Sequence, residues 1–452
     1  MKKLLFSIST LTLSLSAVSA DLSEIFKQSE SHDPLLSAAQ YTLEATSEGK
    51  KQAFSAFLPQ VSSSYGKTFS KNKGNSSLAP GANPSSTGEP ERWDVSLSQS
   101  LYDHTNYQNY KISELEILKS SADYDIAYQD FILRVAQNYF NVLSAQDSLV
   151  FSKAEEKAIQ RQLDQAEQRY EVGLAAITDV HEARATFDGA RARVIVANNS
   201  LEDAKEALFE ISQRYYEELA AAPDELEFTD FSINDVDSFQ DIGDRQNPEL
   251  ISSQIDKDIA EKRISVSKAG HYPTLSLSFQ RDQSFSPGNI ISQPDPTTGI
   301  PQQIDSGDRI SNGTSVSLSL SVPIYSGGRT SSQVRQSALR HKAAMDRYEQ
   351  TRRSTTRNIR NSYHGFTAAK SSIEARKLAM ISAQSGLEAT EAGYEVGTRT
   401  IVDVLNSQQR LYQAQGDYSK AKYDYFIQFL SLKRAAGNLS EGDILTINKV
   451  LK

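Results

Sequence analysis

YEVGLAAITDV (residues 170–180) returns 224 residues later as YEVGTRTIVDV (residues 394–404). Each copy lies between long segments rich in helix-forming residues, and each has the pattern of a tight turn from one helix into the next. Gly173 and Gly397 suit the left-handed position that follows a helix end, where a side chain would be strained. A chain that contains the same hairpin tip twice is predicted to be an internal repeat.

Long helices are predicted on both sides of each turn. The segments at about 105–172 and 329–396 contain no proline, and at 1.5 Å per residue each would form a helix about 100 Å long. The return helices carry apolar residues at alternating spacings of three and four, which is typical of coiled-coil packing, and their alanines indicate close approach of the helices. Thr400 and Asp403 have the spacing of a capping box at the start of the second return helix, whereas the first copy has Ala176 in place of the threonine.

The N-terminus has the organisation of a secretory signal. Two lysines precede an apolar run from Leu4 to Val18, and small residues up to Ala20 provide a cleavage site. Cleavage is expected to leave a mature chain that begins at Asp21; an uncleaved membrane anchor is the alternative. No other stretch approaches the ~18 apolar residues of a membrane helix, so a membrane crossing would have to use strands.

The composition excludes several classes of function. The formal net charge is −9, which disfavours a nucleic-acid partner because phosphate binding needs clustered positive charge. Cysteine is absent, so the chain has no disulfide framework, thiolate nucleophile or cysteine metal site. The six histidines lack metal-ligand spacing, and neither a nucleophile elbow nor a phosphate loop is present. The sequence therefore predicts neither an enzyme nor a cofactor.

Four segments alternate between apolar and polar residues. Asp33-Pro34 and Asn247-Pro248 begin two helices, Pro59 and Pro273 end them, and the pattern then changes to a period of two. Small polar residues fill one face of each segment, which predicts strands with one apolar and one wet face. An ordinary soluble sandwich is the alternative interpretation. The predicted strands begin near Val61, Trp93, Leu275 and Val316, and the loops between them, 71–90 and 284–312, are expected to be surface loops without regular structure.

Four amphipathic strands cannot close a barrel alone, because open edges in lipid would leave backbone groups unsatisfied. Closure needs at least about eight strands, so copies of the chain must share one barrel. The serine-rich face favours a water-filled bore and hence three copies with twelve strands. The predicted fold class is a mixed α and β membrane protein, in which the barrel continues into a long tube of paired helices.

The repeat divides the chain into five parts. Between the copies, the segment that begins at Pro223 holds eight acidic residues and no lysine or arginine, which is typical of a solvated connector. The helix after residue 329 is strongly basic, and pairing with acidic neighbours is the preferred interpretation over a polyanion site. The predicted parts are a signal peptide (1–20), a first repeat (21–222), an acidic connector (223–244), a second repeat (245–436) and a C-terminal tail (437–452).

Several motifs carry a family resemblance. They are QLDQ (162–165), GLAAITDV (173–180), PIYSGG (323–328) and AGYEVGTRTIVDVL (392–405). With these motifs in order, the sequence from Asp21 to about Leu445 closely resembles the TolC family of outer-membrane efflux and secretion channels, the outer membrane factors. The resemblance implies a homotrimer with a twelve-stranded barrel in the lipid of the Gram-negative outer membrane. It also implies a helical tunnel in the periplasm, closed at its far end, and docking to a periplasmic adaptor and an inner-membrane pump of the RND or ABC type.

The same resemblance implies a gate at the helical tips. Thr178 and Asp179 match residues that hold the closed state, with partners that match Tyr394 in the same subunit and Arg399 on a neighbour. Helix capping is the alternative role for Asp179. Charge-assisted hydrogen bonds of this kind are strongest where they are partly buried, and repetition by symmetry could hold a pore shut.

A constriction ring and a docking surface follow from the resemblance as well. Asp403 corresponds to one of two aspartates that surround the constriction, whereas Asn406 stands where the family has the second. Three carboxylates around one bore would favour cations, and the loss of one of the two rings is expected to weaken cation selectivity. The adaptor is expected to contact the tips at Gly173, Leu174, Gly397 and Thr398.

The sequence thus predicts a passive export duct, because no nucleotide site or membrane helix is present to supply energy. The cargo of the duct is set by the pump with which it works and is not encoded in any motif. A periplasmic coiled-coil scaffold without a pore is the alternative, and the alternating strands behind a signal peptide argue against it.

Overall fold

The computed structural model of the chain describes residues 19–73, 85–223, 235–288, 290–295, 297–305 and 307–451. The predicted signal peptide lies, up to residue 18, outside the described residues, as does the first half of the acidic connector, residues 224–234. The chain forms two compact units, which are described separately below. The described residues of the first unit fall within 1–43, 120–254 and 347–452, and those of the second fall within 44–119 and 255–346.

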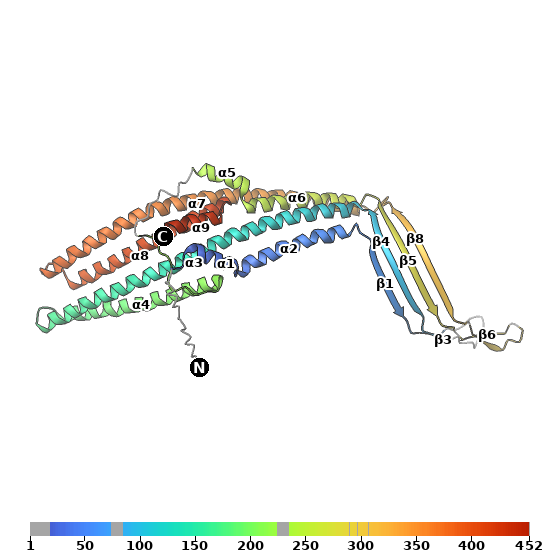
Figure 1. Cartoon of the computed structure of the whole chain (residues 1–452), viewed down its shortest axis with the longest axis horizontal. Helices are drawn as coiled ribbons and strands as arrows, with labels where there is room; N and C mark the ends of the chain where they lie inside the picture. The colour runs from blue at the N-terminus through green and yellow to red at the C-terminus, as the bar shows by residue number, and fades with distance from the viewer. Residues whose placement is uncertain are drawn as a thin grey trace, which may run out of the picture. The chain divides into compact units, whose positions relative to one another are not determined.

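The second unit contains an antiparallel sheet of four strands in the order β1-β4-β5-β8 (Figure 1). All four alternating segments of the sequence form these strands, which confirms the prediction of amphipathic strands. The outer strands, β1 and β8, each have one edge that pairs with no other described strand. Their bounds are β1 Gln60–Lys67, β4 Glu91–Tyr102, β5 Thr274–Ser286 and β8 Arg309–Ser321.

The register of the sheet separates its two faces. Leu277 lies opposite Leu318, and the next pair along the strands is Ser278 opposite Ser317, so successive rungs alternate between apolar and hydroxyl side chains. The apolar face is open, since the Leu318 side chain is 65% exposed. On the serine face, hydroxyls of adjacent strands reach one another, as Ser62 and Ser96 do at 2.8 Å. A face this apolar and this exposed needs a non-aqueous environment or a partner.

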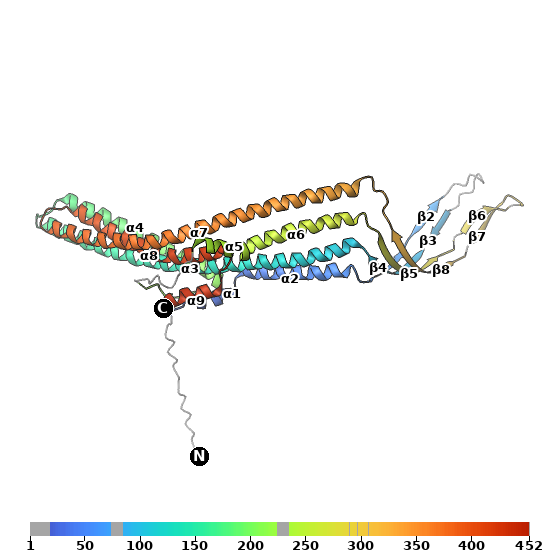
Figure 2. The same ribbon diagram turned by 90° about the horizontal axis from the view of Figure 1, so that it is seen from above.

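Two short hairpins extend the strand pairs, which corrects the prediction that the loops after residues 71 and 284 lack regular structure. Strand β2 (Ser70–Lys73) pairs with β3 (Ser85–Gly88), and β6 (Ile290–Pro294) pairs with β7 (Pro301–Asp305) (Figure 2). These strands are four or five residues long, polar or bounded by proline, and do not alternate, so periodicity could not reveal them.

Helices of the second unit pack in neighbouring pairs. Helix α2 (Pro34–Ser55) lies against α3 (His104–Glu171), where the ring of Phe54 is 6.1 Å from that of Tyr110. Helix α6 (Pro248–Ala269) lies against α7 (Arg329–Glu395), where the Ser267 and Ser337 hydroxyls are 2.7 Å apart. None of the helices in the described ranges combines the length and apolarity of a membrane-spanning helix.

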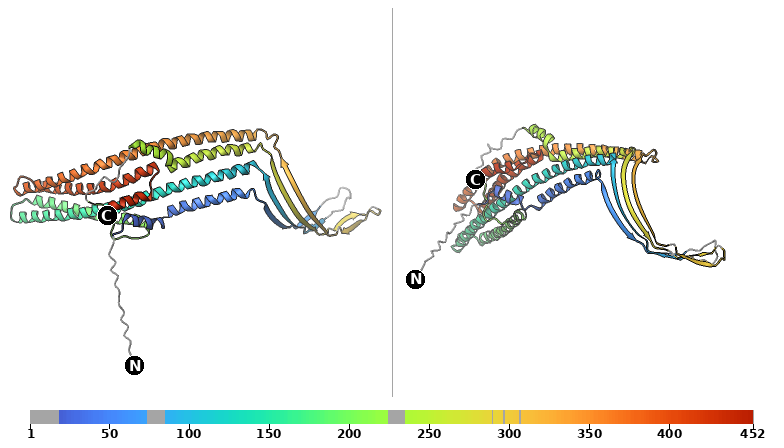
Figure 3. Two further views of the ribbon diagram at one scale, coloured as in Figure 1. Left: turned by 45° about the horizontal axis from the view of Figure 1, so that its top comes forward. Right: turned by 45° about the vertical axis from the view of Figure 1, so that its right-hand side comes forward.

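The first unit is built on two helical hairpins, α3 with α4 (Ile177–Ser212) and α7 with α8 (Ile401–Ala436) (Figure 3). The bounds of α3 and α7 agree with the prediction to within a residue or two. The apolar stripes of the return helices are mostly buried, from Val180 and Ala183 in α4 to Val404 and Leu411 in α8. A shared core joins the hairpins, with the rings of Phe140 and Phe426 stacked at 5.3 Å.

Three shorter helices complete the described part of this unit. They include α1 (Leu22–Glu30) and α5 (Val236–Gln246), which occupies the end of the predicted connector. The predicted C-terminal tail instead contains α9 (Glu441–Val450), whose Ile444 and Ile447 are fully buried. Two apolar residues three positions apart are too few to predict a helix at the end of a sequence.

Candidate functional site

The first hairpin tip is a Schellman motif around Gly173, which has φ +77°. The Gly173 amide donates to the carbonyl of Tyr170 at 2.9 Å, and the Leu174 amide donates to the carbonyl of Arg169 at 2.8 Å. These two bonds satisfy carbonyls that the end of α3 would otherwise leave open, and they require the positive φ that glycine adopts without strain.

The second tip repeats this geometry at Gly397, with φ +80°. The Gly397 amide donates to the carbonyl of Tyr394 at 3.0 Å, and the Thr398 amide donates to that of Gly393 at 2.8 Å. The Thr398 hydroxyl donates to the same Gly393 carbonyl at 3.0 Å. The predicted pair of equivalent helix-to-helix turns is therefore present, with the glycines where the sequence placed them.

Both tips expose apolar side chains to solvent. Leu174 is 78% exposed and Val396 is 75% exposed, while the turns that carry them are fixed by their backbone hydrogen bonds. Fixed, exposed apolar residues at the end of a hairpin are typical of a surface that another protein covers.

The return helices begin differently, as the sequence predicted. Thr400 and Asp403 form a complete capping box, in which the Thr400 amide and hydroxyl donate to Asp403 Oδ2 at 3.0 and 2.9 Å. Ala176 has the same extended conformation at the start of α4 but provides no side-chain cap. The hydrogen bonds from Thr400 hold the pKa of Asp403 below its usual value, so this carboxylate stays charged.

Asp179 occupies the position in α4 that Asp403 occupies in α8, but it is not used by a capping box. Its side chain is partly buried and the neighbouring Thr178 is exposed. Within the described part of the chain, no hydrogen bond to the Asp179 carboxylate is present. Its acceptor oxygens are therefore available to a group outside the chain.

Tyr394 is one of the residues at which the two hairpins meet. Its ring packs against apolar clusters of both hairpins, one around Ile159 and Ala183 and the other around Leu387 and Val404. The guanidinium carbon of Arg169 lies 4.7 Å from the centroid of the ring. Among the described residues no hydrogen bond joins Tyr394 to Asp179, and the pairing of these two residues in the gate stays a prediction.

Arg399 extends from the second tip into solvent. Its aliphatic stem lies over Gly393, where an added Cβ would come within 2.8 Å of Arg399 Cγ. Neither Arg169 nor Gly393 was assigned a role from the sequence. Arg169 is 225 positions from its partner ring, and Gly393 has ordinary helical geometry, so no local pattern marked either residue.

Asp403 and Asn406 lie three residues apart on α8, which places them on the same side of the helix. Asn406 is exposed and Asp403 is partly buried.

A shared apolar cluster holds the two tips together within the chain. Ile401 and Leu405 of α8 are buried among α3 and α4 residues that include Leu163, Ala166 and Val180. Because Ile401 is the first residue of α8, a movement of the second hairpin tip away from the first would expose this cluster.

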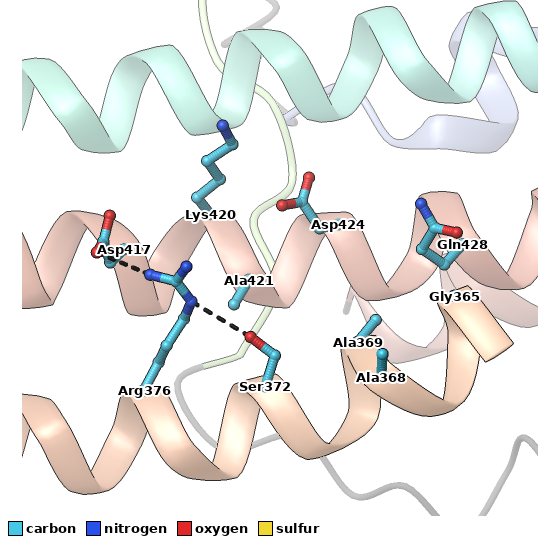
Figure 4. Close-up of a pocket in the computed structure, with 10 residues that line it drawn as sticks. All are labelled: Gly365, Ala368, Ala369, Ser372, Arg376, Asp417, Lys420, Ala421, Asp424 and Gln428. Carbon is cyan, nitrogen blue, oxygen red and sulfur yellow. Dashed lines mark hydrogen bonds and ion pairs between the residues drawn. The ribbon is translucent and has the colours of Figure 1, made fainter.

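A polar groove of about 490 Å³ lies between α7 and α8 (Figure 4). Small residues of α7, among them Gly365 and Ala369, leave this space. Arg376 crosses it to pair with Asp417 at 2.7 Å, so its charge is already neutralised. Among the described residues, no group of three or more histidines and carboxylates is placed to hold a metal ion.

An amphipathic four-stranded sheet with open edges, in a chain that also forms two long helical hairpins with glycine turns, defines a subunit of an outer-membrane channel. The chain belongs to the outer membrane efflux protein family, whose model matches residues 25–212 and 244–438. It is therefore an outer-membrane exit duct, and the family consists of channel proteins.

Individual relatives agree with this assignment. The chain is 36% identical to outer membrane protein TolC of Vibrio cholerae serotype O1, over 100% of this chain and 99% of that protein. It is 28% identical to the alkaline protease secretion protein AprF of Pseudomonas aeruginosa, over 77% of this chain and 70% of that protein. The outer membrane channel CmeC of Campylobacter jejuni shares the fold, with a TM-score of 0.74 at 18% identity over 95% of this chain and 89% of that one.

Proposed function

We propose that three copies of the chain form one duct, in which the strands close a twelve-stranded barrel in the outer membrane and the helices form a tunnel in the periplasm. The sheet order β1-β4-β5-β8 carries this proposal, because it leaves one open edge on each outer strand. Lipid cannot satisfy the backbone groups of an open edge, whereas β1 of one copy can pair with β8 of the next. The serine face would then line a water-filled bore.

Disulfide crosslinking tests the closure directly, since the natural chain has no cysteine. Cysteines at Ser62 of β1 and at Ser315, Ser317 or Ser319 of β8 are expected to give covalent species that stop at the trimer on a non-reducing gel. The control is a pair at Ser98 and Ser278, which lie opposite each other within one sheet and should give only crosslinked monomer. If the control pair crosslinks but no covalent trimer forms, and the chain stays monomeric without detergent, the result would favour the alternative of a periplasmic scaffold without a pore.

The duct would be passive and would serve efflux and type I secretion, as the relative named for protease secretion supports. A periplasmic adaptor would bind the tips at Gly173, Leu174, Gly397 and Thr398, and an inner-membrane pump of the RND or ABC type would supply energy. The exposed Leu174 and Val396 side chains support the docking site. Crosslinking from a photoreactive residue at Leu174 in cells, followed by identification of the captured protein, tests it.

The resting duct would be closed at the tips. Asp179 and Thr178 would bond Tyr394 and, across the subunit boundary, Arg399. The unused carboxylate of Asp179 and the exposed position of Arg399 support this arrangement, because both are available to a second copy. Asp403, which stays charged, would contribute a ring of carboxylates to the constriction, with Asn406 beside it.

A further inference from the structure

The contact between Arg169 and Tyr394 joins two helix ends that are each fixed by backbone hydrogen bonds. The Arg169 carbonyl accepts from Leu174 in the first Schellman motif, and the Tyr394 carbonyl accepts from Gly397 in the second. Each side chain therefore starts from a backbone position that its own turn holds in place. A contact between them ties the end of α3 to the end of α7.

The geometry is that of a cation–π interaction. The Arg169 guanidinium carbon is 4.7 Å from the Tyr394 ring centroid, within the range over which a cation is attracted to the ring quadrupole. Both side chains are partly buried, which reduces screening by water. The planar guanidinium can also stack on the ring, as a lysine ammonium cannot.

Arg169 has no competing acidic partner among the described residues. The nearby Glu167 carboxylate pairs instead with Arg184 at 2.6 Å. The ring of Tyr394 is further held by apolar contacts to both hairpins. The arginine therefore acts on a ring that is already positioned, and the phenol hydroxyl takes no part in the contact.

We propose that Arg169 is a positioning residue of the closed state, which holds the tip of the second hairpin against the first through the aromatic face of Tyr394. This inference rests on the proposed gate and adds a tie within each subunit that is independent of hydrogen bonds to Asp179. Because Arg169 and Tyr394 belong to different hairpins, the contact must break when the hairpins separate. An adaptor that opens the duct must overcome it in every subunit.

The test is single-channel recording of the purified duct in planar bilayers. Arg169→Gln is expected to raise the population of the open state roughly fivefold for each subunit, as the loss of one cation–π contact at a partly buried site implies. Tyr394→Leu should give a similar rise, and the double variant should add little to either single variant. Arg169→Lys, which keeps the charge, should restore part of the closure.

Tyr394→Phe separates the ring from the hydroxyl. In a Tyr394→Phe background, Arg169→Gln should still raise the open population by the same factor, because the aromatic face remains. Arg191→Gln is the matched control, since it removes one arginine charge from an exposed site of the same hairpin and should leave the current at the wild-type level.

The outcomes are distinct. Wild-type closure in Arg169→Gln, or a fully additive effect with Tyr394→Leu, overturns the role of Arg169. If Tyr394→Phe with Arg399→Ser opens the channel while Arg169→Gln does not, the proposed gate stands and this inference alone fails. A purified trimer that gives no current in any of these variants would instead contradict the duct itself. Should Arg169→Gln not assemble, Arg169→Lys decides, and unchanged closure in that variant overturns the stacking contact.

Discussion

Replacing Ala176 with threonine should stabilise the first hairpin and yet open the channel. Ala176 has φ −81° and ψ 152°, close to the φ −93° and ψ 162° of Thr400, and each lies three residues before an aspartate. The substitution should therefore rebuild at Asp179 the capping box that the chain already forms at Asp403. The box would use the Asp179 carboxylate that the proposed gate requires.

The size of the effect follows from known helix caps. A threonine cap in place of alanine is worth about 1 kcal/mol, which corresponds to about fivefold slower opening of the first turn of α4. Hydrogen exchange of a peptide that covers residues 174–182 measures this protection. Single-channel recording measures the gate, which should weaken because one acceptor of each subunit is now bonded locally.

Ala176→Val is the matched control, because valine has the shape of threonine without the hydroxyl. It should give neither the slower exchange nor the higher conductance. If Ala176→Thr slows exchange while conductance stays at the wild-type value, Asp179 does not hold the gate through its carboxylate. If exchange is unchanged, the equivalence of the two helix starts is wrong.

Three further outcomes are expected. Tyr394→Phe with Arg399→Ser should raise single-channel conductance, since it removes two of the proposed hydrogen-bonding groups; an unchanged conductance would exclude that gate. Gly386 lies in open space on α7, so Gly386→Ala should gain about 1 kcal/mol in helix propensity and slow local hydrogen exchange. Gly393→Ala should lose that gain because the added methyl group displaces Arg399, and equal exchange in the two variants would contradict this. Asp403 has a lowered pKa, so its contribution to stability is present above the ordinary aspartate pKa and is lost only as the pH falls through the lower folded value. Cation preference, read as a reversal potential, should therefore persist from pH 7 to pH 5 and fall in Asp403→Asn, and a preference lost by pH 5 would argue against this residue as the ring.

The sequence predicted the elements whose pattern is local. Spacings of a few residues are enough to predict the turns at Gly173 and Gly397, the capping box at Thr400 and the long helices. The four main strands were equally clear, because neither a helix nor a loop commonly produces strict alternation over about ten residues. Helix α9 and the hairpins β2-β3 and β6-β7 were missed, since segments of four to ten residues carry too little periodicity.

The candidate site was predictable only in part. Asp179, Tyr394 and Arg399 could be assigned by resemblance, but a resemblance does not say which contacts form inside one chain. Arg169 illustrates the difference, because an arginine near a helix end is normally taken to interact with the helix dipole or an acid. Its contact with an aromatic ring of the other repeat becomes visible only when both helix ends are placed in space.

The rungs of serine on β5 and β8 carry hydroxyl groups without formal charge. Such a surface forms hydrogen bonds of similar strength with water and with any polar solute, so the net free energy of binding a solute is small. A molecule that passes these serines would not be retained there because of its own chemical groups. The same serine surface could then pass chemically unrelated molecules, and selection among them would be left to the protein that delivers them to the duct.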